Sequence, residues 1–516
     1  MTNLTRAIAT IGGWTVLSRI TGLLREILVA RYLGAGMVAD AFFVAFRFPN
    51  LFRSLFAEGA FNAAFVPLFA GKLEAEGREA ARQFAEECLA VLSWALLAFV
   101  LLMEISMPLA IYGLAPGFGE VPGKMALATE MARITFPYLL FISMVSLQSG
   151  VLNSLGRFAA AAGTPVLLNL TAMAVLVALV PYVETAGHAM AWGVLVAGVV
   201  QFLWLVFSVR SAGLVLRPVR PRLGADVRLM LRRVVPGAVG AGVYQVNLLI
   251  NTMIASEVAN GAVSYLNYAD RINQLPLGVV GIAIGTALLP LMSRQIRAGD
   301  LAAAAESQNR AMELGMLLTL PAALAFITLA LPIVAVLFQR GSFNEADSHA
   351  VAEALMAFAL GLPAYVLVKV LTPAFFARQD TATPVRVAAL TLAVNIACNL
   401  ALIRPLAHVG MALSTALAAW VNVLVLGWLL HRRGFLVTDA RLRRRLWRIL
   451  AASLVMAAML WGGRLLLAPW LTMAGVRLPA LLGLIGFGVL VYGGAVLLVG
   501  AARLDELRAM IRRKSA

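Results

Sequence analysis

The sequence has little charge for its length. Only 13% of its 516 residues are charged, whereas 61% are hydrophobic, and the mean hydropathy is +0.89. A soluble core could not bury that much apolar surface, so the bilayer must be the solvent. The short segments of alternating polarity that a membrane β-barrel requires are also missing. We therefore expect an all-α polytopic membrane protein.

Residues that bind metals or phosphate groups in enzymes are scarce. Cys88 and Cys398, the only two cysteines, lie far apart with no CxxC motif, so we interpret them as apolar packing residues. The four histidines show no metal-ligand spacing, and no GxxxxGK[ST] motif occurs. Neither a metal site nor an ATPase is predicted. The first apolar segment holds Arg19 and Arg25 and lacks a small-residue cleavage site, so it is expected to remain as the first helix.

Long apolar runs recur along the whole chain, each long enough to cross about 30 Å of hydrocarbon as a helix. Because helices satisfy their own backbone hydrogen bonds, a helix bundle follows. The fourteen expected spans cover residues 8–32, 37–57, 86–112, 126–152, 160–181, 187–209, 234–257, 262–291, 309–338, 348–375, 383–403, 408–431, 447–469 and 478–501.

The net charge of +17 could indicate a nucleic-acid partner, but its distribution fits membrane topology better. Seven arginines lie between Arg210 and Arg233, after the sixth span, and seven more lie between Arg432 and Arg448, after the twelfth. The odd-numbered connections are short and carry few basic residues. The positive-inside rule therefore predicts that both termini and both arginine clusters are cytoplasmic.

The two halves of the sequence share ordered motifs. AFVPLFA at 64–70 reappears as ALLPLMS at 287–293. Further pairs follow at similar offsets: Pro137 with Pro363, Thr164 with Thr383, His188 with His408, and Gly213 with Gly434. Similarity of composition among membrane helices is the alternative explanation. Six spans per copy predict parallel repeats, with substrate binding between them near the midplane.

The duplication predicts the domain organisation. An N-terminal lobe is expected at 1–215, a basic cytoplasmic loop at 216–233 and a C-terminal lobe at 234–434. The remainder, 435–516, holds a basic loop, two accessory spans and a cytoplasmic tail.

Charged residues inside spans are costly, at about 2.5 to 3.5 kcal/mol for an arginine at a helix centre, so a cluster needs a counter-charge, water or a ligand. The first span holds Arg19 and Arg25. Two other spans each carry polar residues on one face. The second span contributes Asp40, Arg47, Asn50, Arg53 and Glu58, and the eighth contributes Ser264, Asn267, Asp270, Arg271 and Gln274. We expect both faces to point inward.

These residues could simply pair among themselves and hold helices together. The arginines outnumber the carboxylates, however: Arg19, Arg25, Arg47, Arg53 and Arg271 stand against Asp40, Glu58 and Asp270. The excess predicts an anionic ligand with several oxygens, such as a phosphate or pyrophosphate, bound through bidentate guanidinium hydrogen bonds. Arg47, near a helix end, is a weaker candidate because its side chain could reach the interface.

A second polar set lies on later spans. Asn395 and Asn399 stand four residues apart on one face, and with Thr415 and either Asn247 or Asn251 they could bind sodium. Hydrogen bonding between helices is the alternative role for such residues.

Four ordered strings carry a family resemblance: LSRITGLLREILVARYLGAG, ADAFFVAFRFPNLFRSLFAEGAFNAAFVP, YADRINQLPLGVVGIAIGTALLP and FFARQDTATPV. They resemble the MurJ (MviN) family of the multidrug, oligosaccharidyl-lipid and polysaccharide exporter superfamily, over essentially the whole chain. Members of that family flip lipid II, the undecaprenyl-pyrophosphate-linked disaccharide-pentapeptide of peptidoglycan synthesis, from the inner to the outer leaflet. The resemblance implies two six-helix lobes plus two C-terminal helices that border a hydrophobic groove.

The resemblance also implies site residues. The family's functional arginines fall on Arg19, Arg25, Arg53 and Arg271, and their acidic or amide partners on Asp40, Asn50, Glu58 and Asp270. Ser264 and Gln274 complete the predicted substrate-binding set. Gln274 stands where several relatives carry glutamate, so a carboxylate that proton coupling would use is missing. The sodium set of Asn251, Asn395, Asn399 and Thr415 also lacks a carboxylate, and neutral amides alone would bind sodium weakly.

The sequence thus predicts a lipid II flippase of the bacterial inner membrane that works by alternating access and is not an enzyme. Expected partners are lipid II and membrane lipids, with cell-wall synthesis proteins as candidates and no nucleic acid. No cofactor is expected beyond the candidate sodium ion. The alternatives are a flippase for another polyprenyl-pyrophosphate-linked glycan, a cation-coupled drug antiporter, for which an acid-rich cavity would be expected, and a scaffold that binds nucleic acid or anionic lipid through its basic loops.

Overall fold

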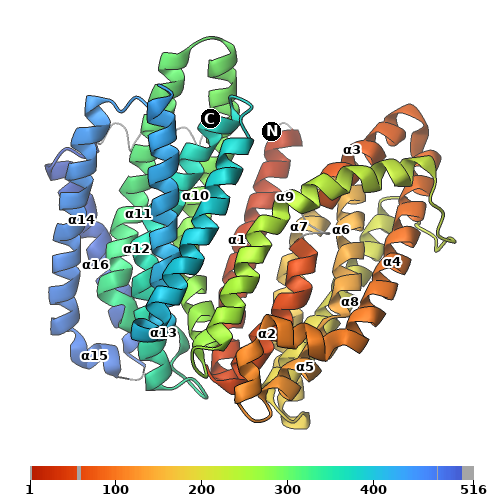
Figure 1. The fold of residues 1–516 in the computed structure, drawn as a ribbon, viewed down its shortest axis with the longest axis horizontal. Coiled ribbons are helices and arrows are strands. Elements are labelled where there is room, and N and C mark those ends of the chain that lie inside the picture. Colours follow the sequence, from red (N-terminus) through yellow and green to blue (C-terminus); the bar gives the residue numbers. More distant parts are fainter. Residues whose placement is uncertain (1–2, 55–59, 474, 503–516) are drawn as a thin grey trace. The chain divides into compact units, whose positions relative to one another are not determined.

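The computed structural model describes residues 3–54, 60–473 and 475–502, and every element in these ranges is helical. The elements, shown in Figure 1, are α1 (Asn3–Leu33), α2 (Met37–Phe52), α3 (Ala60–Ala75), α4 (Gly77–Leu114), η2 (Pro116–Glu120), α5 (Lys124–Thr135), α6 (Tyr138–Ser154), α7 (Phe158–Leu179), η3 (Val180–Tyr182), α8 (Ala186–Ser211), α9 (Ala225–Ser256), α10 (Ala262–Arg297), α11 (Leu301–Phe338), α12 (Glu345–Phe376), α13 (Ala382–Arg432), α14 (Ala440–Leu466), α15 (Ala468–Thr472) and α16 (Arg477–Leu498).

Nine helical stretches in the described ranges are long and apolar enough to cross a membrane. The helices α1, α2, α9 and α10 are not among them, and α2 is only 16 residues long. Three of these four, α1, α2 and α10, carry the arginines predicted to lie inside the bilayer, which lower the hydropathy of any window that contains them. The chain is therefore a multi-pass helical membrane protein, and the number fourteen stays a prediction.

Two of the expected spans form the two arms of α13. The backbone leaves the helical conformation at Ala407, where φ is +47°, and the chain reverses there. Arg433, after the second arm, donates to Asp380, before the first arm, at 2.6 Å. Hydrogen bonds from the Thr383 side chain and backbone and from Arg433 lower the pKa of Asp380 to about 2. The carboxylate of Asp380 therefore stays charged, and paired with Arg433, at any physiological pH.

Several helices begin well before the expected spans. The helices α4, α9 and α11 start at Gly77, Ala225 and Leu301, a little more than two turns before the apolar runs that predicted them. Their first turns are rich in alanine, arginine, glutamate and leucine, which favour helix in water as well as in lipid. An apolar run therefore marks the part of a helix inside the membrane and not the whole helix.

The chain forms two compact units: Met1–Ser264 with Arg340–Phe343, and Tyr265–Gln339 with Asn344–Ala516. We call them unit 1 and unit 2. The boundary between the predicted lobes, at 216–233, does not coincide with the boundary between the units, because α9 packs against α3 and α4 and so belongs to unit 1. The predicted lobes are defined by the repeats in the sequence. Their boundaries stay a prediction.

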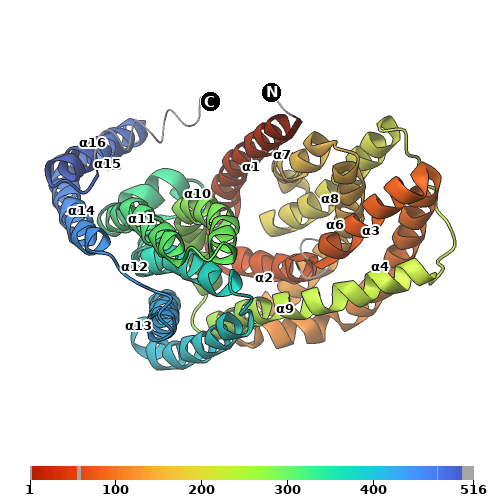
Figure 2. The same ribbon diagram turned by 90° about the horizontal axis from the view of Figure 1, so that it is seen from above.

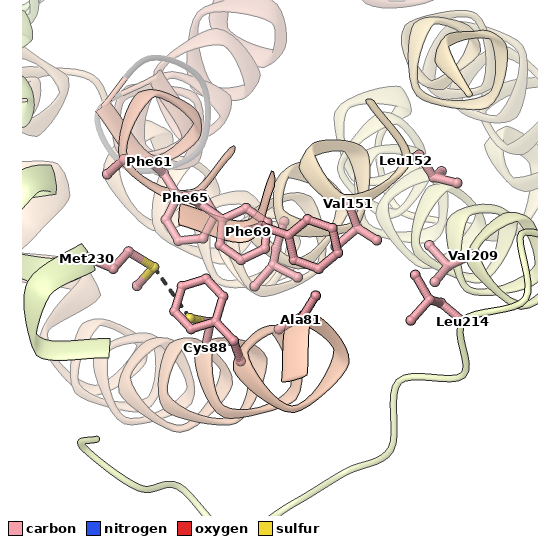
Figure 3. Packing of buried hydrophobic residues seen from close by; sticks show 14 of the residues in the cluster. Phe61, Phe65, Phe69, Ala81, Cys88, Val151, Leu152, Val209, Leu214 and Met230 are labelled. Atoms are coloured by element: carbon pink, nitrogen blue, oxygen red, sulfur yellow. Dashed lines mark hydrogen bonds between the residues drawn. The ribbon is translucent and has the colours of Figure 1, made fainter. Parts of the chain in front are cut away.

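The main core of unit 1 joins α3, α4, α6, α8 and the first turns of α9 (Figure 3). The stacked rings of Phe61, Phe65 and Phe69 follow one face of α3, with neighbouring centroids 5.5 and 5.6 Å apart. Cys88 of α4 is buried there and lies 3.5 Å from the sulfur of Met230 in α9. The cysteine is thus a packing residue, as predicted.

In unit 2, the C-terminal pair α14 and α16 lies along α11, as Figure 2 shows. Tyr492 of α16 donates to the Leu317 carbonyl of α11 at 2.7 Å, and Arg464 of α14 donates to the Thr328 carbonyl at 3.1 Å. The buried carboxylate of Glu313 in α11 also accepts from Arg445 of α14. These bonds attach the predicted accessory pair to one side of unit 2.

Two glycines that the sequence pairs end their helices with the same local geometry. Gly213 and Gly434, which the sequence pairs, both follow a long helix with positive φ, at +82° and +70°. At each site the next residue, Leu214 or Phe435, donates back to a helical carbonyl, closing the same left-handed cap that glycine adopts most easily. Gly156, Gly299 and Gly500, which the sequence does not pair, close the same kind of cap, so the internal duplication stays a prediction.

Candidate functional site

The helix α1 carries two of the predicted arginines. Arg19 is half-buried and has no hydrogen-bond or ion-pair partner within the described part of the chain. Arg25 is held by the adjacent Glu26, with 2.8 Å between nitrogen and carboxylate oxygen, and only 11% of its side chain is exposed. A carboxylate that the sequence analysis overlooked thus fixes Arg25.

The polar face of α2 begins at one end of the helix and continues to the other. Asn50 accepts from the guanidinium of Arg53 at 2.9 Å, which is the i, i+3 contact expected for residues on one helix face. Arg47 donates to Thr252 of α9 within unit 1. Glu58, the last member of this predicted face, lies outside the described residues.

Asp40, near the beginning of α2, is completely buried. One of its carboxylate oxygens accepts from the Lys124 ammonium and from the Gly261 backbone N–H, both at 2.7 Å. The other accepts from the Ser264 backbone N–H at 2.8 Å and from the Ser264 hydroxyl at 2.5 Å. Asp40 therefore caps the first turn of α10 and pairs with the lysine.

Lys124 is as deeply buried as its partner, at 1% exposed. Its ammonium also donates to Asn260 at 2.8 Å and lies 4.2 Å from the centre of the Phe118 ring. This arrangement gives Asp40 and Ser264 partners within unit 1, and their role in substrate binding stays a prediction. In this structure Asp40 binds Ser264 and Lys124, because a carboxylate without solvent needs a cation and several donors around it.

In unit 2, α10 carries the second polar face. Gln274 donates to Asp270 at 3.4 Å, and both Gln274 and Arg271 are exposed. Lys369 of α12 lies against Gly281, about two turns beyond Gln274 along α10, where an added Cβ would come within 2.9 Å of the lysine Cδ. Lys369 is a cation inside a predicted span and should have been included among the candidates on that ground alone.

The predicted sodium ligands are divided between the units. Asn251 belongs to unit 1, whereas Asn395, Asn399 and Thr415 belong to α13 in unit 2. The two asparagines are buried and Asn399 donates to Asn395 at 3.4 Å, while the Thr415 hydroxyl donates to its own helix at Met411. The sodium site stays a prediction.

These contacts add two residues to the charge balance that pointed to an anion. Lys124 neutralises Asp40, and Glu26 neutralises one arginine. Along α1 and α2, arginines still outnumber the carboxylates that the structure describes there. Lys124 and Glu26 together add one charge of each sign to the predicted set, so the predicted excess of positive charge is unchanged.

The chain matches the family model described as lipid II flippase MurJ over residues 29–482. It belongs to the MurJ family. A protein of Rhizobium meliloti (strain 1021) described as a probable lipid II flippase MurJ is 45% identical over 522 residues, which cover 99% of this chain and 97% of the relative.

Two solved structures have a similar fold. One described as a lipid II flippase MurJ in an inward closed conformation is 25% identical, with a TM-score of 0.78 over 97% of this chain and 99% of the other. An inward-facing multidrug transporter of the MATE family is 16% identical, with a TM-score of 0.68 over 81% of this chain and 94% of the other. The second likeness concerns the fold alone, so the family model and not the architecture distinguishes MurJ proteins from drug exporters.

Proposed function

We propose that this chain moves lipid II from the inner to the outer leaflet of the bacterial cytoplasmic membrane by alternating access, without making or breaking a covalent bond. Membership of the MurJ family supports the substrate. Binding of an anionic group is supported by the surplus of arginine over carboxylate along α1 and α2. Within the described residues, Arg19 of α1 is half-buried and has no partner.

We assign the pyrophosphate of lipid II to Arg19, Arg25, Arg53 and Arg271. A guanidinium offers two parallel N–H donors to phosphate oxygens, and such charge-assisted bonds strengthen away from water. Glu26 and Asn50 orient two of these arginines through the 2.8 and 2.9 Å contacts described above. The polyprenyl tail needs no polar partner and stays in the lipid. A drug antiporter would require an excess of carboxylates instead.

Binding should therefore depend on the pyrophosphate and not on the peptide. With purified protein and labelled lipid II, undecaprenyl pyrophosphate is expected to compete and the soluble pentapeptide is not. Arg19→Ala should weaken binding by about tenfold or more, since hydrogen bonds to charged groups contribute about 1.5 to 3 kcal/mol. Arg220→Ala, in the exposed segment after α8, is the matched control and should bind like the wild type. Strong competition by the peptide alone would place the site away from the arginines.

We further propose that both termini and the Arg210–Arg233 segment are cytoplasmic. In a cysteine-free background, single cysteines at Arg220 or Arg444, both exposed, should react with an impermeant thiol reagent only after the membrane is permeabilised. A cysteine at Tyr182, 83% exposed and beyond the other end of α8, should react in intact cells. Labelling of position 220 from outside would reverse the topology.

A further inference from the structure

Three side chains lie close together at one end of unit 1. The proposed transport of lipid II assigns no role to them. They are Glu130 of α5, Glu184 in the connection between η3 and α8, and His188 in the first turn of α8. One ligand atom of each lies within 4.8 Å of those of the other two. We propose that they form a Zn²⁺ site.

The distances fit a tetrahedral ion. Nitrogen and oxygen ligands about 2.0 to 2.2 Å from zinc lie about 3.3 to 3.5 Å from each other. The Nε2 atom of His188 is 3.4 Å from a carboxylate oxygen of Glu130. Glu184 is exposed and its carboxylate lies within 4.8 Å of the other two ligand atoms, a gap that a rotation of the side chain would close on binding the ion. Three protein ligands leave the fourth position to water.

A contact of the His188 Nδ1 atom fixes the orientation of the imidazole ring. Only 9% of His188 is exposed, and its Nδ1 atom lies 3.0 Å from the hydroxyl of Thr185, the N-cap residue of α8. With Nδ1–H donating to that hydroxyl, the lone pair of Nε2 points toward the two carboxylates. A hydrogen bond of this kind behind a ligating imidazole fixes its tautomer and orientation in metal sites.

The ligand set selects the class of metal. An imidazole with two carboxylates suits zinc and similar borderline ions, whereas magnesium and calcium prefer oxygen ligands alone. The simpler alternative is an ion pair between protonated His188 and Glu130. That pair would not explain why a second carboxylate, Glu184, points to the same place.

The position gives the site a role in stabilising unit 1. His188 lies at the end of α8 opposite to Arg210, about 33 Å away along the helix at about 1.5 Å per residue. A bound ion would join α8 to α5, the helix whose first residue, Lys124, pairs with Asp40. With the Arg210–Arg233 segment in the cytoplasm, this end faces the outside, where zinc is available without competition from the cytosolic thiols.

The repeat provides a matched control. His408 is the counterpart of His188 in the second half of the sequence, but its Nε2 lies 2.9 Å from the Ala350 carbonyl, to which it donates. It therefore has no Nε2 lone pair for a metal. Glu120, exposed in η2, is the control for the two glutamates.

The test uses the full-length purified protein with its affinity tag removed. After treatment with EDTA, the protein is loaded with ZnCl2 and desalted, and its zinc content and melting temperature are measured. Wild type, His408→Gln and Glu120→Gln are expected to retain one zinc per chain and to melt at a higher temperature with zinc than without it. His188→Gln, Glu130→Gln and Glu184→Gln should lose both the zinc and the shift.

Two results would overturn the site. The wild type would retain no zinc, or the His188→Gln and Glu184→Gln proteins would retain as much as the wild type. Glu184 lies in an exposed connection, so its replacement does not depend on refolding of a helix. The measurement involves no lipid II, and its outcome is therefore separate from that of the transport proposal.

Discussion

Arg271→Ala is expected to abolish lipid II export while leaving the protein in the membrane. Arg271 is the one arginine of unit 2 among the four assigned to the pyrophosphate. It is exposed on the polar face of α10, where Gln274 already donates to the neighbouring Asp270. Removing a bidentate donor from a doubly charged ligand costs several kilocalories, whereas removing a charge from a span does not hinder insertion.

The measurement is complementation of a depleted strain, with membrane abundance determined in parallel. Arg271→Lys should rescue poorly, because lysine keeps the charge but loses the planar fork. Arg294→Ala, an exposed residue in the last turns of the same helix, should support normal growth. Normal growth and normal lipid II export with Arg271→Ala would show that Asp270 and Arg271 have a structural role and that Arg271 does not bind the pyrophosphate.

Lys124→Met should destabilise the protein more than any surface substitution. The ammonium is buried against Asp40, and removal of one partner leaves a charge without compensation, at a cost of about 3 to 5 kcal/mol. A lower melting temperature and lower membrane abundance are the expected results. Adding Asp40→Asn to Lys124→Met should recover part of the loss, because the uncompensated carboxylate is then removed.

Lys72 provides the comparison for Lys124. Its ion pairs with Glu76 and Asp226 lie at the surface, with those two carboxylates about half exposed. Pairs of this kind contribute about 1 kcal/mol or less, so Lys72→Met should change the melting temperature only slightly. An equally small loss for Lys124→Met would show that the Asp40–Lys124 pair is dispensable.

The helical architecture could be predicted because the bilayer imposes length and hydropathy on each span. The same rule could not locate the ends of α4, α9 and α11, which continue into water, nor the helix α3, which the sequence analysis treated as a connection. It did anticipate the reversal within α13, since the two expected spans end and begin on either side of Ala407.

The candidate site could be predicted where partners share a helix face. The Asn50–Arg53 and Asp270–Gln274 contacts follow from spacings of three and four residues. Contacts between helices could not be read in this way. Lys124 is 84 residues from Asp40, and no periodicity connects them.

The proposed zinc ligands show the same limit of sequence reasoning. His188 stands 58 residues from Glu130, so spacing along the chain gave no metal signal. Because the histidines show no metal-ligand spacing, the sequence predicts no metal site that involves them. The folded unit brings the two residues together with Glu184, and only the structure makes that cluster visible.

The most direct test of transport is to measure lipid II separately in the two leaflets after this protein is depleted. Lipid II is expected to accumulate in the inner leaflet while the outer-leaflet pool falls, and wild-type protein should restore the distribution whereas Arg271→Ala should not. An unchanged outer-leaflet pool of lipid II, with accumulation of a different polyprenyl-linked glycan, would contradict the proposed substrate.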